Sequence, residues 1–197
     1  MSTAVLLIDL QHDFLSPDGA YGRAGLGNAD LAALPARVAP VLDAARAAAV
    51  PIVSAQFTIV ARRGRPPQIA EHLHALRPFL GPGDFEPGRR GHDLVDALAP
   101  ADVVVEKVAF SAFHQSRLEW VLQGLGADHL LVAGIVTNGG VASTVRDAHV
   151  RGLATTLLAD GCAAFDREAH DATLRSLRGV TRLSTCAGAI GELAAGA

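Results

Sequence analysis

Short apolar runs alternate with segments of helical periodicity along most of the chain, and this alternation constrains the fold more than any other feature. The runs cover residues 4–8, 51–55, 103–105, 130–133 and 154–159. Uninterrupted apolar runs of this length indicate strands that are buried on both faces of a parallel sheet. Between them, apolar residues recur at helical spacing in 31–45, 118–125 and 141–152. We therefore expect an α/β protein, a three-layer α/β/α sandwich with a doubly wound, mostly parallel, Rossmann-like sheet.

Length and charge narrow the class of protein further. The 197 residues, half of them hydrophobic, suit a single domain over 1–197 with a large core. A net charge of −3 gives no general basic field, so neither nucleic acid nor a membrane surface is expected as a partner. The first apolar run ends at Asp9 without a basic flank, and the chain has two cysteines. We expect a cytoplasmic protein without a disulfide framework that acts on a small-molecule substrate.

Polar residues stand where the predicted strands end, and ligands of such sheets bind at the carboxyl ends of the strands. Asp9, Gln56 and Lys107 occupy three of these positions, and the turn 134–140 occupies a fourth. A partly desolvated Asp9 could serve as a general acid or base, and Lys107 could hold charge and orient a substrate. Taken alone, Asp9 is equally well explained as a turn cap, and a lysine at a strand end is most often simply solvated. The turn could present amides to an anion or simply connect strand to helix.

The segment 57–91 interrupts the alternation with many prolines and glycines, and a connection this long is usually a functional loop or lid. It carries Arg62, Arg63 and Arg65. A guanidinium here, with Arg65 as the candidate, could bind a substrate carboxylate through two hydrogen bonds. A solvated basic turn explains the same residues equally well.

Aromatic and histidine residues add weaker indications. Phe14 and Phe113 could wall a pocket, whereas Trp120 lies at helical spacing and suits the core or an interface. The eight histidines show no metal-binding spacing, so no metal and no cofactor is expected.

Three segments carry a resemblance to a known family. They read L-L-I-D-L-Q-H-D-F around Asp9, E-K-V-A-F-S-A-F around Lys107, and G-I-V-T-N-G-G-V-A-S-T-V-R-D-A from Gly134. In this order they are similar to the signature blocks of the isochorismatase-like hydrolases, and the similarity spans nearly the whole chain. The resemblance implies the isochorismatase-like α/β fold and a homodimer or larger homo-oligomer.

Most members of that family use a cysteine nucleophile together with an Asp and a Lys, and the position of that cysteine falls on Gly140 here. The resemblance implies catalytic roles for Asp9 and Lys107, with the Gly140 amides lining the site. We expect the Asp9 and Lys107 side chains to share one cleft, joined by a charge-assisted hydrogen bond of about 2.7 to 2.9 Å. The resemblance also implies a cis peptide bond between Val136 and Thr137. The candidate substrate-binding residues are Phe14, Gln56, Arg65, Phe113, Val136, Thr137, Asn138 and Gly139.

The absent cysteine leaves three functions open. Segments 55–56, 81–83 and 110–116 resemble true isochorismatases, vinyl-ether hydrolases of secondary metabolism that need no protein nucleophile; Asp9 would protonate the enol-pyruvyl ether, and we favour this function. The pair Thr137 and Asn138 is closer to the cysteine hydrolases, which favours an amide or imide hydrolase with a non-cysteine mechanism. Gly140 alone would also suit a non-catalytic ligand-binding homologue. We expect Cys162 to be a buried apolar residue.

Overall fold

The computed structural model describes residues 2–196 and contains a six-stranded sheet of order β3-β2-β1-β4-β5-β6, in which every pairing is parallel. The strands are β1 (Thr3–Ile8), β2 (Ile52–Phe57), β3 (Val103–Lys107), β4 (His129–Gly134), β5 (Ala154–Cys162) and β6 (Arg182–Ser184). The predicted α/β sandwich is confirmed, and five strands match the predicted runs. The short edge strand β6 was not predicted, because its sequence R-L-S has no apolar run.

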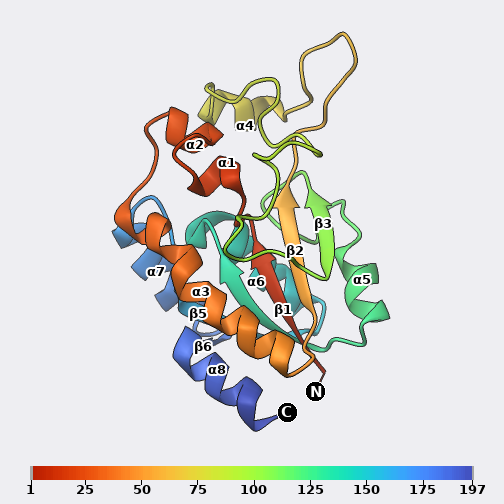
Figure 1. Cartoon of the computed structure of the whole chain (residues 1–197), viewed down its shortest axis with the longest axis vertical. Helices are drawn as coiled ribbons and strands as arrows, with labels where there is room; N and C mark the ends of the chain where they lie inside the picture. Colours follow the sequence, from red (N-terminus) through yellow and green to blue (C-terminus); the bar gives the residue numbers. More distant parts are fainter. Residues whose placement is uncertain (1, 197) are drawn as a thin grey trace.

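Two layers of helices cover the sheet, and α3 and α8 lie across the face toward the viewer in Figure 1. The helices of this layer are α3 (Ala29–Ala47) and α8 (Cys186–Ala195), and those of the other layer are α5 (Leu118–Gly124), α6 (Ala142–Val150) and α7 (Arg167–Leu177). Successive side chains of β1 enter opposite layers, with Val5 and Leu7 in one core and Leu6 and Ile8 in the other. The sheet is therefore buried on both faces, as its continuous apolar runs indicate.

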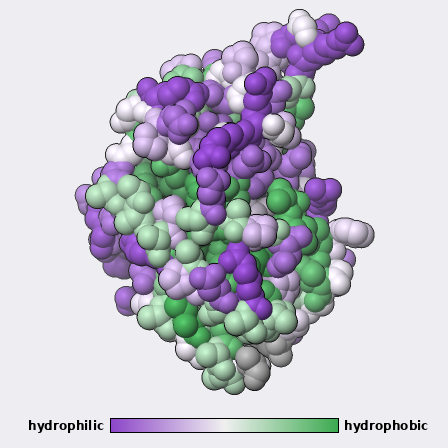
Figure 2. Space-filling model, viewed as in Figure 1, coloured by the Kyte–Doolittle hydropathy of each residue, from purple (hydrophilic) through white to green (hydrophobic). Residues whose placement is uncertain are grey.

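Three short helices lie beyond the carboxyl ends of the strands, at the top of Figure 1: α1 (His12–Leu15), α2 (Ala20–Arg23) and α4 (Glu71–Leu76). The rest of the segment 57–91 surrounds them, and its projecting arm is hydrophilic in Figure 2. Beneath this surface the aromatic side chains of Phe14, Tyr21, Phe57 and Phe85 pack edge to face or tilted. An aromatic cap thus closes the end of the sheet at which ligands of this fold bind.

No helix within residues 2–196 is long and apolar enough to cross a lipid bilayer.

Candidate active site

Asp9 and Lys107 form a buried ion pair at the carboxyl end of the sheet. Asp9 follows β1 directly, with a left-handed φ of 57°, a conformation that Asp tolerates better than most residues. The Lys107 Nζ atom lies 2.8 Å from Asp9 Oδ2, the expected pairing distance. The Phe57 amide donates to Asp9 Oδ1 at 3.0 Å, and Lys107 also donates to the Ala109 carbonyl at 3.0 Å. β2 lies between the two strands, so the parallel sheet brings together residues almost a hundred positions apart.

Burial dominates the electrostatics of the pair. Asp9 is 4% exposed and Lys107 is 1% exposed. Desolvation raises the pKa of Asp9 above its ordinary value, while the Lys107 ammonium and the Phe57 amide lower that pKa by less. A carboxyl group with a raised pKa can exchange protons closer to neutral pH, which is the property needed for general acid or base catalysis.

A cavity of about 30 Å³ adjoins the pair. Of the residues expected from the sequence, five line it: Asp9, Phe14, Lys107, Val136 and Gly140. Five further lining residues were not among the predicted site residues: Tyr21, Phe57, Leu73, Arg77 and Phe110. Apart from the ion pair and Arg77, the walls are largely apolar and aromatic, so a charge inside is poorly screened by water.

Arg77 supplies the positive charge that we expected from Arg65. Its Nε donates to the Tyr21 hydroxyl at 2.6 Å, and its guanidinium carbon lies 5.9 Å from the centre of the Phe110 ring. Burial raises the pKa of Tyr21, and Arg77 opposes that shift. Arg65 instead lines a separate surface cavity that contains neither Asp9 nor Lys107. Arg77 belongs to the same segment, 57–91, as Arg65, and the arginines of this segment have no periodicity that would identify which one lines the cavity beside Asp9.

The turn after β4 presents only two of its residues to the cavity. It forms η1 (Thr137–Val141), a single π-helical turn that leads into α6. A Cβ atom built on Gly140 would lie 3.0 Å from Asp9 Oδ2 and 3.2 Å from the Ile135 carbonyl oxygen. Val136 lines the cavity together with Gly140, one helical turn apart.

The three residues between them lie elsewhere. The Thr137 hydroxyl is buried and lies 2.8 Å from His170 Nδ1, and Asn138 is exposed. The amide of Thr137 donates to the Ala163 carbonyl, and the amide of Gly139 donates to the Val136 carbonyl. These two amides are therefore not available to bind an anion. The cis peptide bond joins Ile135 to Val136, one residue earlier than expected.

Two further expected residues lie away from the cavity. Gln56 is buried on β2, on the opposite face of the strand from Phe57, because side chains alternate along a strand. Phe113 is part of the core under α5 and α6, with the Arg151 guanidinium 4.7 Å from its ring centre. Phe110, three residues earlier, lines the cavity instead. Trp120 is 75% exposed and does not belong to the core.

Neither cysteine lines this cavity. Cys162 and Cys186 are both buried, and desolvation raises the pKa of each thiol to about 12. A thiol with so high a pKa is almost entirely protonated near neutral pH and is a poor nucleophile. Across residues 2–196, no three His, Cys, Asp or Glu side chains cluster in a way that could hold a metal ion.

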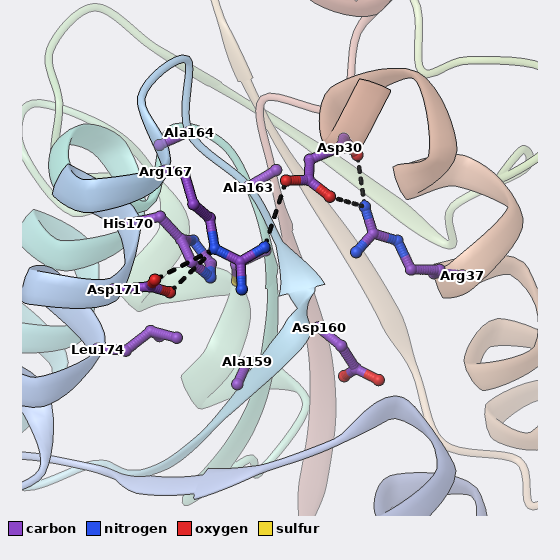
Figure 3. A pocket seen from close by; sticks show the side chains of 11 residues that line it. Asp30, Arg37, Ala159, Asp160, Ala163, Ala164, Arg167, His170, Asp171 and Leu174 are labelled. Carbon is purple, nitrogen blue, oxygen red and sulfur yellow. Dashed lines mark hydrogen bonds and ion pairs between the residues drawn. The ribbon is translucent and has the colours of Figure 1, made fainter. Parts of the chain in front are cut away.

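A second cavity, of about 230 Å³, lies between α3, β5 and α7 (Figure 3). Here Arg167 lies 3.1 Å from Asp171 and 3.4 Å from Asp30, and Arg37 lies 3.6 Å from Asp30. Both guanidinium groups already have carboxylate partners, so we assign no ligand to this cavity. His170 lines it, and the bond to Thr137 connects it to the turn of Gly140.

Comparison with known proteins adds the following. Residues 3–188 match the isochorismatase domain family. The ureidoacrylate amidohydrolase RutB of Pantoea ananatis is 31% identical over 161 residues, which are 74% of this chain and 62% of that protein, so the match spans less than two thirds of its length. RutB of Caulobacter vibrioides strain CB 15 is 31% identical over 170 residues, 81% of this chain and 76% of that protein. The crystal structure of a cysteine hydrolase from Pseudomonas syringae superposes with a TM-score of 0.84 at 26% identity, covering 100% of this chain and 94% of that one.

Proposed function

The chain belongs to the isochorismatase domain family, and we propose that it hydrolyses an amide or ureido C–N bond without a cysteine nucleophile. The observation that carries the proposal is the buried Asp9–Lys107 pair facing Gly140. The sequence motifs favoured vinyl-ether cleavage, but the relatives named above are amidohydrolases, which supports the amide alternative.

The space beside Gly140 suggests the nucleophile. A Cβ atom at residue 140 would lie 3.0 Å from Asp9 Oδ2 and 3.2 Å from the Ile135 carbonyl oxygen, so glycine leaves the Asp9 carboxylate open on this side. We propose that a water molecule hydrogen-bonded to that carboxylate is the nucleophile. Asp9 accepts a proton as the water oxygen attacks the carbonyl carbon, and then passes that proton to the leaving nitrogen as the C–N bond breaks. Lys107 Nζ, 2.8 Å from Asp9 Oδ2, holds the carboxylate in position. The products are an acid and ammonia, and no redox partner is needed.

Thiol chemistry provides the sharpest test of the missing nucleophile. Because the pKa of both thiols is raised to about 12, iodoacetamide should leave the activity of the wild-type protein unchanged. The variant Gly140→Cys would place a thiol beside Asp9, and the contact of 3.0 Å requires only a small adjustment there. We expect this variant to hydrolyse amides faster than the wild type and to become sensitive to iodoacetamide. Rapid inactivation of the wild type would contradict the proposal.

The position of Arg77 in the cavity suggests the chemical class of the amide substrate. It is the cationic side chain in the cavity that is not paired with Asp9, and a guanidinium binds carboxylates through two parallel hydrogen bonds. We therefore propose a substrate that carries a carboxylate as well as the scissile amide, such as a ureido acid or an N-carbamoyl amino acid. This assignment agrees with the name of the ureidoacrylate-hydrolysing relatives.

Ammonia release from a panel of ureido acids, N-carbamoyl amino acids and simple carboxamides tests the activity directly. Asp9→Asn keeps the shape of the side chain and removes the base, so it should abolish turnover while the protein remains folded by circular dichroism. An unchanged rate in Asp9→Asn would refute the role of this carboxylate. A folded wild type without activity on any member of the panel would favour a ligand-binding homologue.

Gly140 also supports a second candidate, cleavage of an enol-pyruvyl ether such as isochorismate. In that reaction Asp9 donates its proton to the methylene carbon, and water captures the resulting cation, so no thiol is required. Pyruvate release from isochorismate, measured beside the amide panel, distinguishes the two. Pyruvate without ammonia would favour the ether and overturn the amide proposal.

A further inference from the structure

The cavity beside Asp9 adjoins a much larger groove. The cavity beside Asp9 measures about 30 Å³, whereas the adjoining groove measures about 730 Å³. Phe57, Leu73 and Phe110 line both spaces, so their side chains form the partition between them. On the same measure the cavity beside Asp9 is far smaller than the groove. A substrate whose amide reaches Asp9 would therefore find room for its distal part in the groove.

The walls of the groove are apolar and carry no full charge of their own. The residues that line them come from three segments, 57–60, 68–76 and 108–115. The residues that line these walls include no Lys, Arg, Asp or Glu; their polar members are Thr58, Gln68, His72, His114 and Gln115. A charged group placed here would lose hydration without gaining a partner, whereas an apolar group would not.

Exposed hydrophobic side chains gather on the same surface. Eight large hydrophobic side chains are exposed among residues 2–196, and four of them line this groove: Val60, Leu76, Val108 and Phe110. Single exposed hydrophobic residues are ordinary, but several that converge on a groove beside a catalytic pair are typical of a ligand-binding surface.

We propose that the groove binds the distal part of the substrate, and that this part is an uncharged alkyl or aryl group. This inference rests on the proposed function, since it places the scissile amide at Asp9 and the substrate carboxylate at Arg77. Leu73 and Phe110 contact the substrate between its reacting end and its apolar end. The substrate class is then an N-carbamoyl or related amido acid with an apolar side chain, not a small hydrophilic ureido acid.

A homologous series of substrates with increasing chain length tests whether the groove binds an apolar side chain. For the N-carbamoyl derivatives of glycine, alanine, 2-aminobutyrate, norvaline and norleucine, kcat/KM should rise about fourfold for each added methylene, the equivalent of about 0.8 kcal/mol. Leu76→Asp and Val60→Asp put a charge into the groove at positions that are 72% and 43% exposed, so folding should survive. Both variants should flatten the dependence of kcat/KM on chain length.

Val150→Asp is the matched control. Val150 is 80% exposed at the end of α6 and lines none of the cavities described above, so the same change there should preserve the chain-length dependence. A flat dependence in the wild type, or one that Leu76→Asp and Val60→Asp leave intact, would overturn the groove assignment while the amide activity itself stood.

A second probe separates this inference from the proposed activity. Alkan-2-ones from acetone to octan-2-one carry a carbonyl group but no leaving nitrogen, and their binding can be followed by saturation-transfer NMR without any turnover. Affinity that rises with chain length in the wild type and not in Leu76→Asp would support the groove even if no amide were hydrolysed. Binding independent of chain length would overturn it.

Discussion

Two ion-paired regions of this molecule contain the same kinds of side chain at similar distances, yet only one is suited to chemistry. Lys107 and Asp9 are 2.8 Å apart with side chains 1% and 6% exposed, whereas Arg167 and Asp171 are 3.1 Å apart with side chains 70% and 43% exposed. Coulomb energy at equal distance grows as the effective dielectric constant falls, and so does the cost of losing one partner. Burial, rather than contact distance, therefore decides how strongly a charge pair affects stability and chemistry.

The surroundings explain the difference in burial. The Asp9 pair lies under the aromatic cap, at the junction of β1, β2 and the turn of Gly140. Arg167 and Asp171 lie one helical turn apart on α7. Both are open to solvent and line the cavity of Figure 3. Water screens the second pair and leaves the first unscreened, so substitutions in the two regions should differ greatly in effect.

The largest effect is expected from Lys107→Ala. The substitution leaves the Asp9 carboxyl buried without its partner, so kcat/KM should fall about a hundredfold or more, and the free energy of unfolding should fall by about 3–5 kcal/mol. Urea denaturation and steady-state kinetics measure the two quantities. The double variant Asp9→Asn with Lys107→Met should recover most of the stability and none of the activity. If kcat/KM of Lys107→Ala stayed within a few fold of the wild-type value, the buried pair would matter no more for activity than the exposed pair of Arg167 and Asp171.

The second-largest effect is expected in the pH dependence of kcat/KM. The pKa of Asp9 is raised above 3.8, chiefly by burial, and a general base must be deprotonated to act. As the pH falls through that raised pKa, kcat/KM for amides should decrease about tenfold per unit, with a midpoint clearly above the ordinary Asp range. An enol-ether substrate requires protonated Asp9, so its rate should instead decrease as the pH rises. A profile that is flat from pH 4 to pH 8 would be inconsistent with both roles.

A moderate effect is expected from Arg77→Ala. Loss of a charge-assisted pair with a substrate carboxylate should raise KM for ureido acids about tenfold or more, with a smaller change for neutral carboxamides. Arg65→Ala is the matched control, because Arg65 lies in a different cavity. Equal effects of the Arg77 change on charged and neutral substrates would assign this residue to packing with Tyr21 and Phe110 instead.

The smallest effect is expected from Arg167→Ala. Its pair with Asp171 is solvent-exposed, so neither the unfolding free energy nor kcat/KM should change beyond the error of measurement. Thermal denaturation and the amide assay check both quantities. A clear loss of activity would show that the cavity of Figure 3 acts on the catalytic turn, and the bond between Thr137 and His170 would be the first connection to examine.

The sequence predicted that polar residues stand at the carboxyl end of the sheet, and it predicted the pairing of Asp9 with Lys107 that the structure contains. Apolar runs identify buried strands locally, and in a parallel sheet every strand presents its carboxyl end at the same edge. Asp9 and Lys107 stand at two such ends, so their meeting follows from the topology alone. Family resemblance added Gly140 and Val136, which lie in the turn at a third strand end.

The facing of individual side chains was decided only by the tertiary structure. β2 continues two residues beyond its predicted end, so Phe57 faces the cavity and Gln56 faces the opposite side. In and just before the π-helical turn, Gly140 and Val136 line the cavity while Asn138 is exposed. Arg77 and Tyr21 come from segments without a strand or helix period that could orient them in advance. Their positions depend on packing against distant aromatic residues, and such contacts exist only once the sheet has brought both segments to its carboxyl end.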